Sequence, residues 1–259
     1  MIARYSNYVM ASIYPLLFTV LGVAVVGVLA GIRLAGMHEV SRVLVAFSGG
    51  VLLGVAGFWI IPEIAEHTGW MVALAGAAGG FSLMWVIDRY VHAICPSCSH
   101  DHVHEDCVNR LHGFAAPLLI ASGLHSFFDG WGLAVAQTQG FEGVRTALLI
   151  GISIHKLPEA MAMGVLLLAA TGKRVEAALG AIAAQAMLLV GGAIAVFVAG
   201  RIGFAWSAIL LAIAAGAFAY LGYHAVEGEY RRRGMALTFV PAMTGAVGAA
   251  ALKSLLPGA

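Results

Sequence analysis

The sequence predicts an all-α, polytopic membrane protein, and both its composition and its pattern support this fold class. Hydrophobic residues occupy 61% of the 259 positions and charged residues only 10%, whereas soluble domains average about 25% charged residues. The apolar residues fall into runs of roughly 20, the length that a helix needs to cross the hydrocarbon core of a bilayer. Short polar connectors between the runs hold most of the charged side chains.

Eight apolar runs predict eight transmembrane helices. In chain order these spans cover residues 12–32, 43–62, 70–91, 114–137, 144–170, 175–200, 204–226 and 236–256. Each span stops at a polar connector, and the connectors are 33–42, 63–69, 92–112, 138–143, 171–176, 201–203 and 227–234. Small residues let transmembrane helices pack closely, so we expect helix contacts at the pairs Gly27/Gly31, Gly50/Gly54 and Gly76/Gly80.

The spans differ in where they carry charge. The first two contain no charged residue, the third has Asp88 and Arg89 at its end, and the sixth and eighth have one charged residue each near an end. The seventh has none. Spans four and five alone carry several ionisable groups near their middles, which makes them the candidates for function.

The distribution of lysine and arginine predicts the orientation, because cytoplasmic loops carry an excess of both. With both termini outside, the inner connectors and the inner ends of the spans hold nine of the 14 lysines and arginines. The outer segments and the outer ends of the spans hold four, and Lys156 lies near the middle of a span. The inner nine are Arg33, Arg42, Arg89, Arg110, Lys173, Arg174, Arg231, Arg232 and Arg233. We therefore expect a multi-pass protein of the plasma (inner) membrane with both termini outside.

We expect a single transmembrane domain over residues 1–259, in which the connector 92–112 is the one long polar insertion. An inverted repeat of spans 1–3 and 6–8 around spans 4 and 5 would fit a transporter, but the sequence shows no clear internal similarity. The net charge of +1 argues against a nucleic-acid partner. The lipid bilayer and small ions are the expected partners, and a monomer and a homodimer both fit the sequence.

Two stretches carry the expected chemistry: H-S-F-F-D-G at 125–130 and H-K-L-P-E-A at 155–160. In each, a histidine is followed four residues later by an acid, His125 by Asp129 and His155 by Glu159. Residues four apart share a helix face, and the short connector makes the two spans antiparallel neighbours. The four side chains can therefore converge, and imidazole with carboxylate suits Zn²⁺ and other first-row divalent ions.

Pro158 lies between the ligands of span five. It cannot donate a hydrogen bond to the carbonyl of Ile154, so the helix is expected to kink or loosen there. Loosened backbone at membrane depth is tolerated where it lines an ion site. A kink that serves packing alone is the alternative.

The two motifs resemble the paired signature of the ZIP (Zrt-, Irt-like) family of divalent metal transporters. That family has H-[NS]-x-x-E-G in its fourth span and a [HQ]-x-x-P-E or H-x-x-x-E pattern in its fifth. Eight spans, outer termini and a histidine-rich cytoplasmic loop between spans three and four also match. The resemblance implies a ZIP-like bundle in which spans four and five move metal toward the cytoplasm, with His125, Asp129, His155 and Glu159 as ligands.

This chain departs from the family pattern at several positions. Asp129 stands where glutamate is usual, and Ser126 and Lys156 stand where many members have asparagine and aspartate of a second metal position. A protonated lysine cannot ligate a metal, so we expect Lys156 to take the place of a second cation and one ion to bind per site. In span six, Gln185 is expected to be a neutral substitute for a glutamate ligand or a hydrogen-bond donor behind the ligands; a plain interhelical hydrogen bond is the alternative.

The ends of the spans suggest an entrance and an exit. Span two ends in W-I-I-P-E, where the family often has H-L-L-P-E, so Trp59 replaces a histidine. Glu63, Glu66 and His67 face outside in the expected topology and would form a cation-concentrating funnel or an ordinary solvated helix end. Asp88 is the candidate for the inner exit, and His224 is expected to be an interfacial histidine.

The connector 92–112 is dense in metal-binding side chains. Thiolate and imidazole favour Zn²⁺ and similar ions, and the candidates are Cys95, Cys98, His100, His102, His104 and Cys107. These residues exceed the four ligands of a zinc site, so the sequence leaves the actual set open. A cytosolic metal acceptor, a sensor, a structural clip and a plain polar loop are the alternatives.

The sequence therefore predicts uptake of Zn²⁺, with Cd²⁺, Fe²⁺ or Mn²⁺ as further candidates, because His and carboxylate ligands accept all four. No enzymatic activity and no cofactor beyond the transported ion are expected. Two rivals remain: an intramembrane zinc-dependent hydrolase, which would need an open coordination position and lacks an H-E-x-x-H motif, and a metal sensor that does not transport. Metal-dependent hydrolysis without flux would favour the first, and binding without flux the second.

Overall fold

The structure, a computed structural model, describes residues 2–34, 38–91, 107–138 and 142–255, and every regular element in these ranges is a helix. The elements are α1 (Ile2–Arg33), α2 (His38–Gly54), the π-helix η1 (Val55–Ile60), α3 (Ile61–Thr68), α4 (Trp70–Val91), α5 (Cys107–Thr138), α6 (Glu142–Thr171), α7 (Arg174–Arg233) and α8 (Met235–Leu255). The predicted all-α fold is confirmed.

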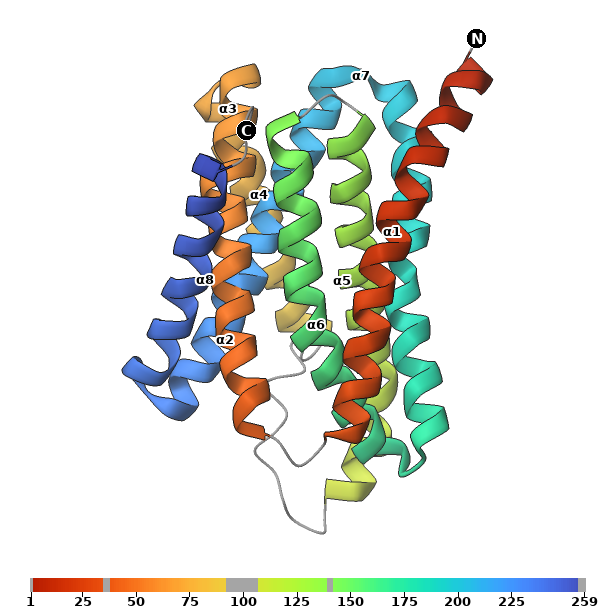
Figure 1. Ribbon diagram of the computed structural model, residues 1–259, viewed down its shortest axis with the longest axis vertical. Helices are drawn as coiled ribbons and strands as arrows, with labels where there is room; N and C mark the ends of the chain where they lie inside the picture. Colours follow the sequence, from red (N-terminus) through yellow and green to blue (C-terminus); the bar gives the residue numbers. More distant parts are fainter. Residues whose placement is uncertain (1, 35–37, 92–106, 139–141, 256–259) are drawn as a thin grey trace.

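The described helices account for the predicted spans. Span two consists of α2, η1 and α3 in succession, and α7 contains spans six and seven. α7 breaks at Gly203, whose φ of 72° is in the left-handed region that glycine adopts readily, and this break lies in the predicted connector 201–203. Within the described residues, seven segments are long and apolar enough to cross a membrane, and α5 runs beside them through the bundle as the expected fourth span (Figure 1).

Several helices are longer than the apolar runs predict. α1 begins at Ile2 rather than near residue 12, and α5 begins at Cys107, inside the predicted connector 92–112. Helix formation is costly to start and favourable to extend, so a helix continues past its membrane-spanning part until a breaking residue stops it. The apolar runs therefore locate the spans but not the ends of the helices.

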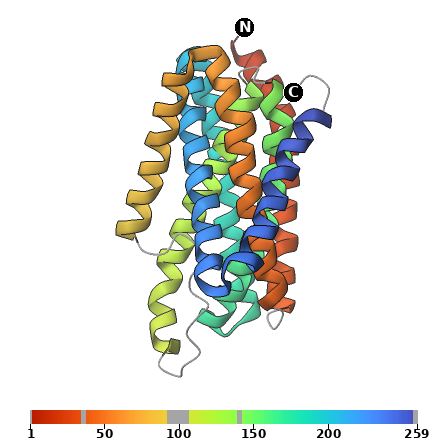
Figure 2. The same ribbon diagram turned by 90° about the vertical axis from the view of Figure 1, so that its left-hand side faces the viewer.

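The helices form one bundle whose members run roughly along its long axis (Figures 1 and 2). α5 and α6 run side by side through the middle; α1 and the first half of α7 lie on one side of them, and α2 and α8 on the other (Figure 1). α1 begins and α8 ends at the same end of the bundle, as an even number of crossings requires. The middle of the bundle is thus where α5 and α6 face each other.

Glycines determine how closely these helices approach. At several positions an added Cβ atom would overlap a backbone carbonyl oxygen of the neighbouring helix, so that no larger residue fits. Among these overlaps are Gly31 with Met161, Gly50 with Ala242, Gly80 with Ile213, Gly130 with Leu188 and Gly191 with Phe127. One glycine of each predicted pair lies at such an overlap, and its partner lies against a carbonyl or an alanine side chain of the neighbouring helix. Gly130 and Gly191 bring α5 against α7 in the same way.

The π-helix η1 interrupts span two and presents Trp59 to α8. The Trp59 side chain is 1% exposed, and its indole N–H donates a hydrogen bond of 2.7 Å to the carbonyl of Ala249. The ammonium of Lys253 donates to the carbonyl of Phe58, also in η1, at 3.3 Å. Trp59, which replaces a histidine of the family pattern, therefore packs between helices.

Two adjacent glycines of α4 test the importance of this packing. In Gly80→Ala the new methyl group would meet the carbonyl of Ile213, whereas the Cβ of Gly79→Ala would have nothing within 4 Å. Overpacking costs about 1–3 kcal/mol, so we expect Gly80→Ala to lower the melting temperature in detergent. Gly79→Ala is expected to leave it unchanged or raise it, because alanine favours helix by about 1 kcal/mol. Equal melting temperatures for the two variants would contradict this picture.

Candidate metal site

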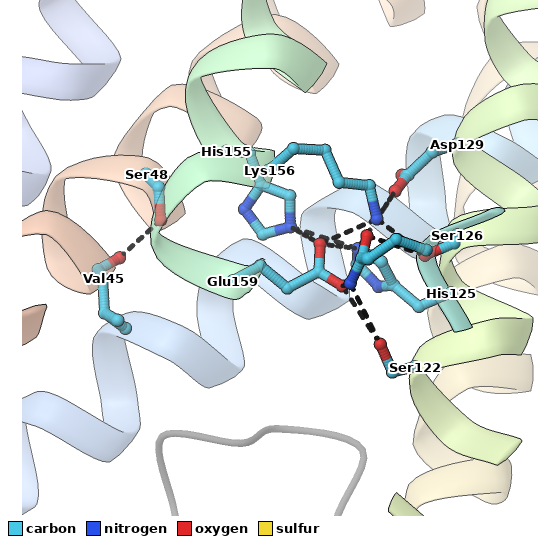
Figure 3. Close-up of polar contacts among 10 residues, drawn as sticks. Val45, Ser48, Ser122, His125, Ser126, Asp129, His155, Lys156 and Glu159 are labelled. Carbon is cyan, nitrogen blue, oxygen red and sulfur yellow. Dashed lines mark hydrogen bonds and ion pairs between the residues drawn. The ribbon is translucent and has the colours of Figure 1, made fainter. Parts of the chain in front are cut away.

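The candidate site lies where the middle of α5 faces the middle of α6. α5 contributes Ser122, His125, Ser126 and Asp129, and α6 contributes His155, Lys156 and Glu159 (Figure 3). Helical spacing places these side chains on the facing sides of the two helices, and in Figure 3 they point toward one another. The side chains of both histidines and both acids are at most 9% exposed.

Three ligand atoms converge in this site. The Nε2 atoms of His125 and His155 are 3.1 Å apart, and Oε2 of Glu159 lies 3.4 Å from the first and 3.5 Å from the second. Zn²⁺ takes nitrogen and oxygen ligands at about 2.0–2.2 Å, and a tetrahedral arrangement then separates the ligand atoms by about 3.3–3.5 Å. The two distances to Glu159 fall within this range and the distance between the nitrogens is slightly shorter, so the three atoms lie near the spacing of a tetrahedral divalent ion.

Asp129 is engaged differently from the other three expected ligands. Its Oδ2 lies 3.3 Å from Nε2 of His125, but only 2.6 Å from Nζ of Lys156. The compact ligand cluster consists of His125, His155 and Glu159 and does not include Asp129. The lysine therefore holds the fourth expected ligand beside the cluster.

Lys156 is fully buried, with an exposed fraction of 0%. Besides Asp129, its ammonium contacts Oε2 of Glu159 at 2.8 Å and donates to Oγ of Ser126 at 2.9 Å. Three acceptors thus surround an ammonium that has three protons to donate. A buried charge is tolerated only when it is paired in this way.

Gln185 of α7 links the site to a third helix. Its amide nitrogen donates to Oε1 of Glu159 at 3.1 Å and to Oγ of Ser122 at 3.3 Å, while its amide oxygen accepts from Ser126 at 3.1 Å. One Glu159 oxygen is therefore held by Gln185, which leaves the other oxygen facing the histidines and the lysine. Gln185 acts in this arrangement as a donor behind the ligands.

Three buried polar atoms at the site have no hydrogen-bond partner among the described residues: Nδ1 of His155 and both carboxylate oxygens of Asp129. One of these oxygens, Oδ2, is ion-paired with Lys156. Unsatisfied buried polar atoms are costly and rare in folded proteins. Together with the closely spaced ligand atoms, they make this cluster the candidate metal site of the described residues.

Comparison with known protein families places the chain in a family. A family model described as ZIP Zinc transporter matches residues 95–226, which include α5, α6 and most of α7. The chain belongs to the ZIP zinc transporter family. No curated protein matches it.

Family membership carries the general function. ZIP proteins are multi-pass membrane proteins that transport divalent metal ions and are not enzymes, and the seven apolar helical segments of the described residues agree with this. This chain is therefore an integral membrane protein that transports divalent metal ions. The matched residues include every side chain of the candidate site.

The expected entrance residues of this ZIP chain lie away from the site. Glu63, Glu66 and His67 belong to α3, at the end of the bundle where α1 begins (Figure 1). His67 is 3.7 Å from Glu63, and its ring meets the edge of Phe204. The three residues thus lie together on α3 at one end of the bundle, whereas the candidate site lies between the middles of α5 and α6.

Asp88 and His224, the expected exit and interfacial residues, face each other across α4 and α7. The hydroxyl of Tyr220 donates to Oδ2 of Asp88 at 2.5 Å, and Nδ1 of His224 lies 3.9 Å from the same oxygen. The rings of Tyr220 and His224 are stacked. The structure therefore gives Asp88 a role in joining two helices.

The loop candidates fall outside what the structure describes. Cys95, Cys98, His100, His102 and His104 lie in the undescribed segment, and only the backbone of Cys107 is described, as the first residue of α5. The sequence analysis missed one contact residue, Ser122, whose hydroxyl lies 3.5 Å from Glu159. Its position one helical turn before Ser126 is the signal that could have found it.

α6 remains helical through Pro158, the residue at which a kink or loosening was expected.

The different engagement of the two acids predicts different effects on metal binding. Both acids are paired with Lys156, but only Glu159 belongs to the ligand cluster. Glu159→Gln therefore removes a charged oxygen from the cluster, whereas Asp129→Asn changes a group beside it. Loss of a group behind the ligands costs about 10–100-fold in metal affinity, and we expect Glu159→Gln to cost more than Asp129→Asn.

Zn²⁺ titration of the purified protein would measure this difference. The background for all variants replaces the six loop candidates, so that only the transmembrane site is titrated. An equal or larger effect of Asp129→Asn would contradict the assignment of Glu159 to the cluster and of Asp129 to the lysine.

Proposed function

We propose that the protein takes up divalent metal ions, Zn²⁺ foremost, toward the cytoplasm through a site formed by His125, His155 and Glu159 with Asp129 beside them. The observation that carries this proposal is the buried cluster of three ligand atoms within 4.8 Å of one another on α5 and α6. The cluster lies in the segment that matches the ZIP family.

The donor set supports Zn²⁺ as the main substrate. Two imidazole nitrogens and one carboxylate oxygen form a borderline set that Zn²⁺ binds well, and that Mg²⁺ and Ca²⁺, which prefer oxygen, bind poorly. Cd²⁺, Fe²⁺ and Mn²⁺ accept the same ligand types and are the expected competitors. Asp129 or water would complete the coordination.

One ion is proposed to bind at a time. The ammonium of Lys156 lies 2.6 Å from Asp129 and 2.8 Å from Glu159, between the two carboxylates that a second cation would need. A second divalent ion there would meet a fixed positive charge at close range. The lysine thus supplies the charge balance that a second metal would otherwise supply.

The direction of transport follows from the expected orientation. Nine lysines and arginines lie in the connectors and span ends assigned to the cytoplasm and four on the outer side, which supports outer termini in a plasma membrane. Glu63, Glu66 and His67 would then collect ions at the outer end. The Cys/His-rich connector would receive them on the inner side.

Transport would proceed by alternating access to this one site. An arriving ion sheds water for the ligands, and one group of helices then shifts against the rest to open the site inward. The sequence contains no nucleotide-binding motif, so the metal gradient, chelation inside the cell or proton exchange on the ligands would drive uptake.

Uptake assays in proteoliposomes test the assignment of the site. We expect Zn²⁺ uptake that is inhibited by Cd²⁺, Fe²⁺ and Mn²⁺ and hardly by Mg²⁺, and that is lost in His155→Ala/Glu159→Ala, because two of the three cluster ligands are then gone. The Gly79→Ala variant, altered far from the site, serves as the control. Undiminished Zn²⁺ uptake by the double variant would contradict the assignment of His155 and Glu159 to the transport site. Zn²⁺-dependent hydrolysis without flux, or binding without flux, would instead favour the enzyme or the sensor.

Acid pH should weaken transport. A metal binds imidazole and carboxylate only in their deprotonated forms, so protons compete with the ion at this site. We expect the KM for Zn²⁺ to rise as the outer pH falls from about 7.5 to about 5.5, the range in which histidine ordinarily titrates. Initial rates of Zn²⁺ uptake at several pH values measure this effect. A KM that stays constant over this range would contradict a histidine-based site.

A further inference from the structure

We propose that Lys156 is a built-in counter-charge that allows the empty site to return across the membrane after it has released its ion. The proposal rests on the proposed function, because it concerns the second half of the same transport cycle. In this proposal Lys156 affects the rate of the transport cycle, in addition to occupying the position of a second cation.

The contacts of Lys156 suit a charge that stays in place while ions come and go. Its ammonium touches Asp129, Glu159 and Ser126 at 2.6, 2.8 and 2.9 Å. When an ion binds Glu159, Lys156 can keep its contacts with Asp129 and Ser126. Lys156 is also the one lysine or arginine that the sequence places near the middle of a predicted span.

The net charge of the site follows from these groups. Two carboxylates and one ammonium leave the empty site with one net negative charge when both imidazoles are neutral, as metal binding requires. A bound divalent ion changes this to one net positive charge. Without the lysine, the loaded site would be neutral and the empty site would carry two negative charges.

The cost of a buried charge decides which form moves slowly. In a low-dielectric interior the Born energy rises with the square of the net charge. With Lys156, the loaded and the empty site have charges of equal size and meet similar costs when they move through the bundle. Without it, the empty site would be the costly form, at about four times the cost of a single charge.

Gln185 and Ser126 hold the Glu159 carboxylate and the ammonium in fixed positions by hydrogen bonds. Gln185 holds the second oxygen of Glu159 at 3.1 Å and accepts a hydrogen bond from Ser126, which itself accepts one from Lys156. The acids and the ammonium are thus held together by α5, α6 and α7, and the empty site moves as a paired unit rather than as two free carboxylates.

Two transport modes separate the empty return from every other step. Net uptake into vesicles that contain only a chelator requires the empty site to return. Exchange, measured as entry of radioactive Zn²⁺ into vesicles preloaded with unlabelled Zn²⁺, does not. For Lys156→Gln we expect the ratio of net uptake to exchange to fall by about tenfold or more, because an uncompensated buried charge remains.

Charge-restoring variants distinguish this role from a structural one. Lys156→Arg keeps the positive charge, and the double variant Lys156→Gln/Asp129→Asn restores one net negative charge to the empty site; both should return the ratio toward that of the wild type. Lys173→Gln, at an exposed pair with Glu176, is the matched lysine control and should leave the ratio unchanged. Gel filtration in detergent verifies that each variant is folded.

The outcomes separate the two proposals. If Lys156→Gln lowers net uptake and exchange by the same factor, or if the double variant does not recover the ratio, the counter-charge role is wrong although the protein transports. If the wild-type protein shows neither net uptake nor exchange of Zn²⁺, the proposed function itself fails.

Discussion

The ion pairs of Lys156 are the constraint on which the centre of this protein depends. A fully buried ammonium lies 2.6 Å from Asp129 and 2.8 Å from Glu159. Removing one partner of a buried pair typically costs about 3–5 kcal/mol, because a charge is then left without compensation. The two acids are therefore tolerated in the bundle because each is paired with the ammonium, and the ammonium because it is paired with both acids. The pair with Asp129 joins α6 to α5. The two histidines, one turn away on the same helix faces, meet as a consequence.

Close helix packing is what allows short side chains to complete this centre. Gly130 and Gly191 bring the backbones of α5 and α7 so near that a Cβ atom at either would overlap a carbonyl of the other helix. At that separation the amide of Gln185 reaches both Ser126 and Glu159. These two glycines thus contribute to the geometry of the candidate metal site.

The sequence was sufficient for the spans and for the residues that share a helix face, because both follow from helical periodicity. The spacing of four residues brought His125 together with Asp129 and His155 with Glu159, and the short connector made α5 and α6 neighbours. It could not show that Asp129 would turn to Lys156 rather than join the ligand cluster, since the choice depends on rotamers and on competition between an ammonium and a metal ion.

Contacts between distant parts of the chain could not be predicted from helical periodicity, because they depend on how the helices pack. The partner of Asp88 is Tyr220, 132 residues away, and the partner of Trp59 is a backbone carbonyl in α8. Asp88 was considered for the inner exit, and Trp59 stands where the family often has a histidine, yet each joins two helices in the fold. A polar residue near the end of a span has two common uses, and only its neighbours in space distinguish them.

The pairing at Lys156 also bears on which ions the proposed site would accept. Four converging ligands with two free carboxylates would offer a site of high negative charge, which hard cations such as Mg²⁺ and Ca²⁺ favour. With Asp129 held by the lysine, two imidazole nitrogens and a single carboxylate oxygen remain within 4.8 Å of one another. Such a set favours borderline ions, and it carries little net charge to attract the far more abundant hard ones. In this site, the lysine that makes two buried acids tolerable would therefore also make the donor set suitable for zinc.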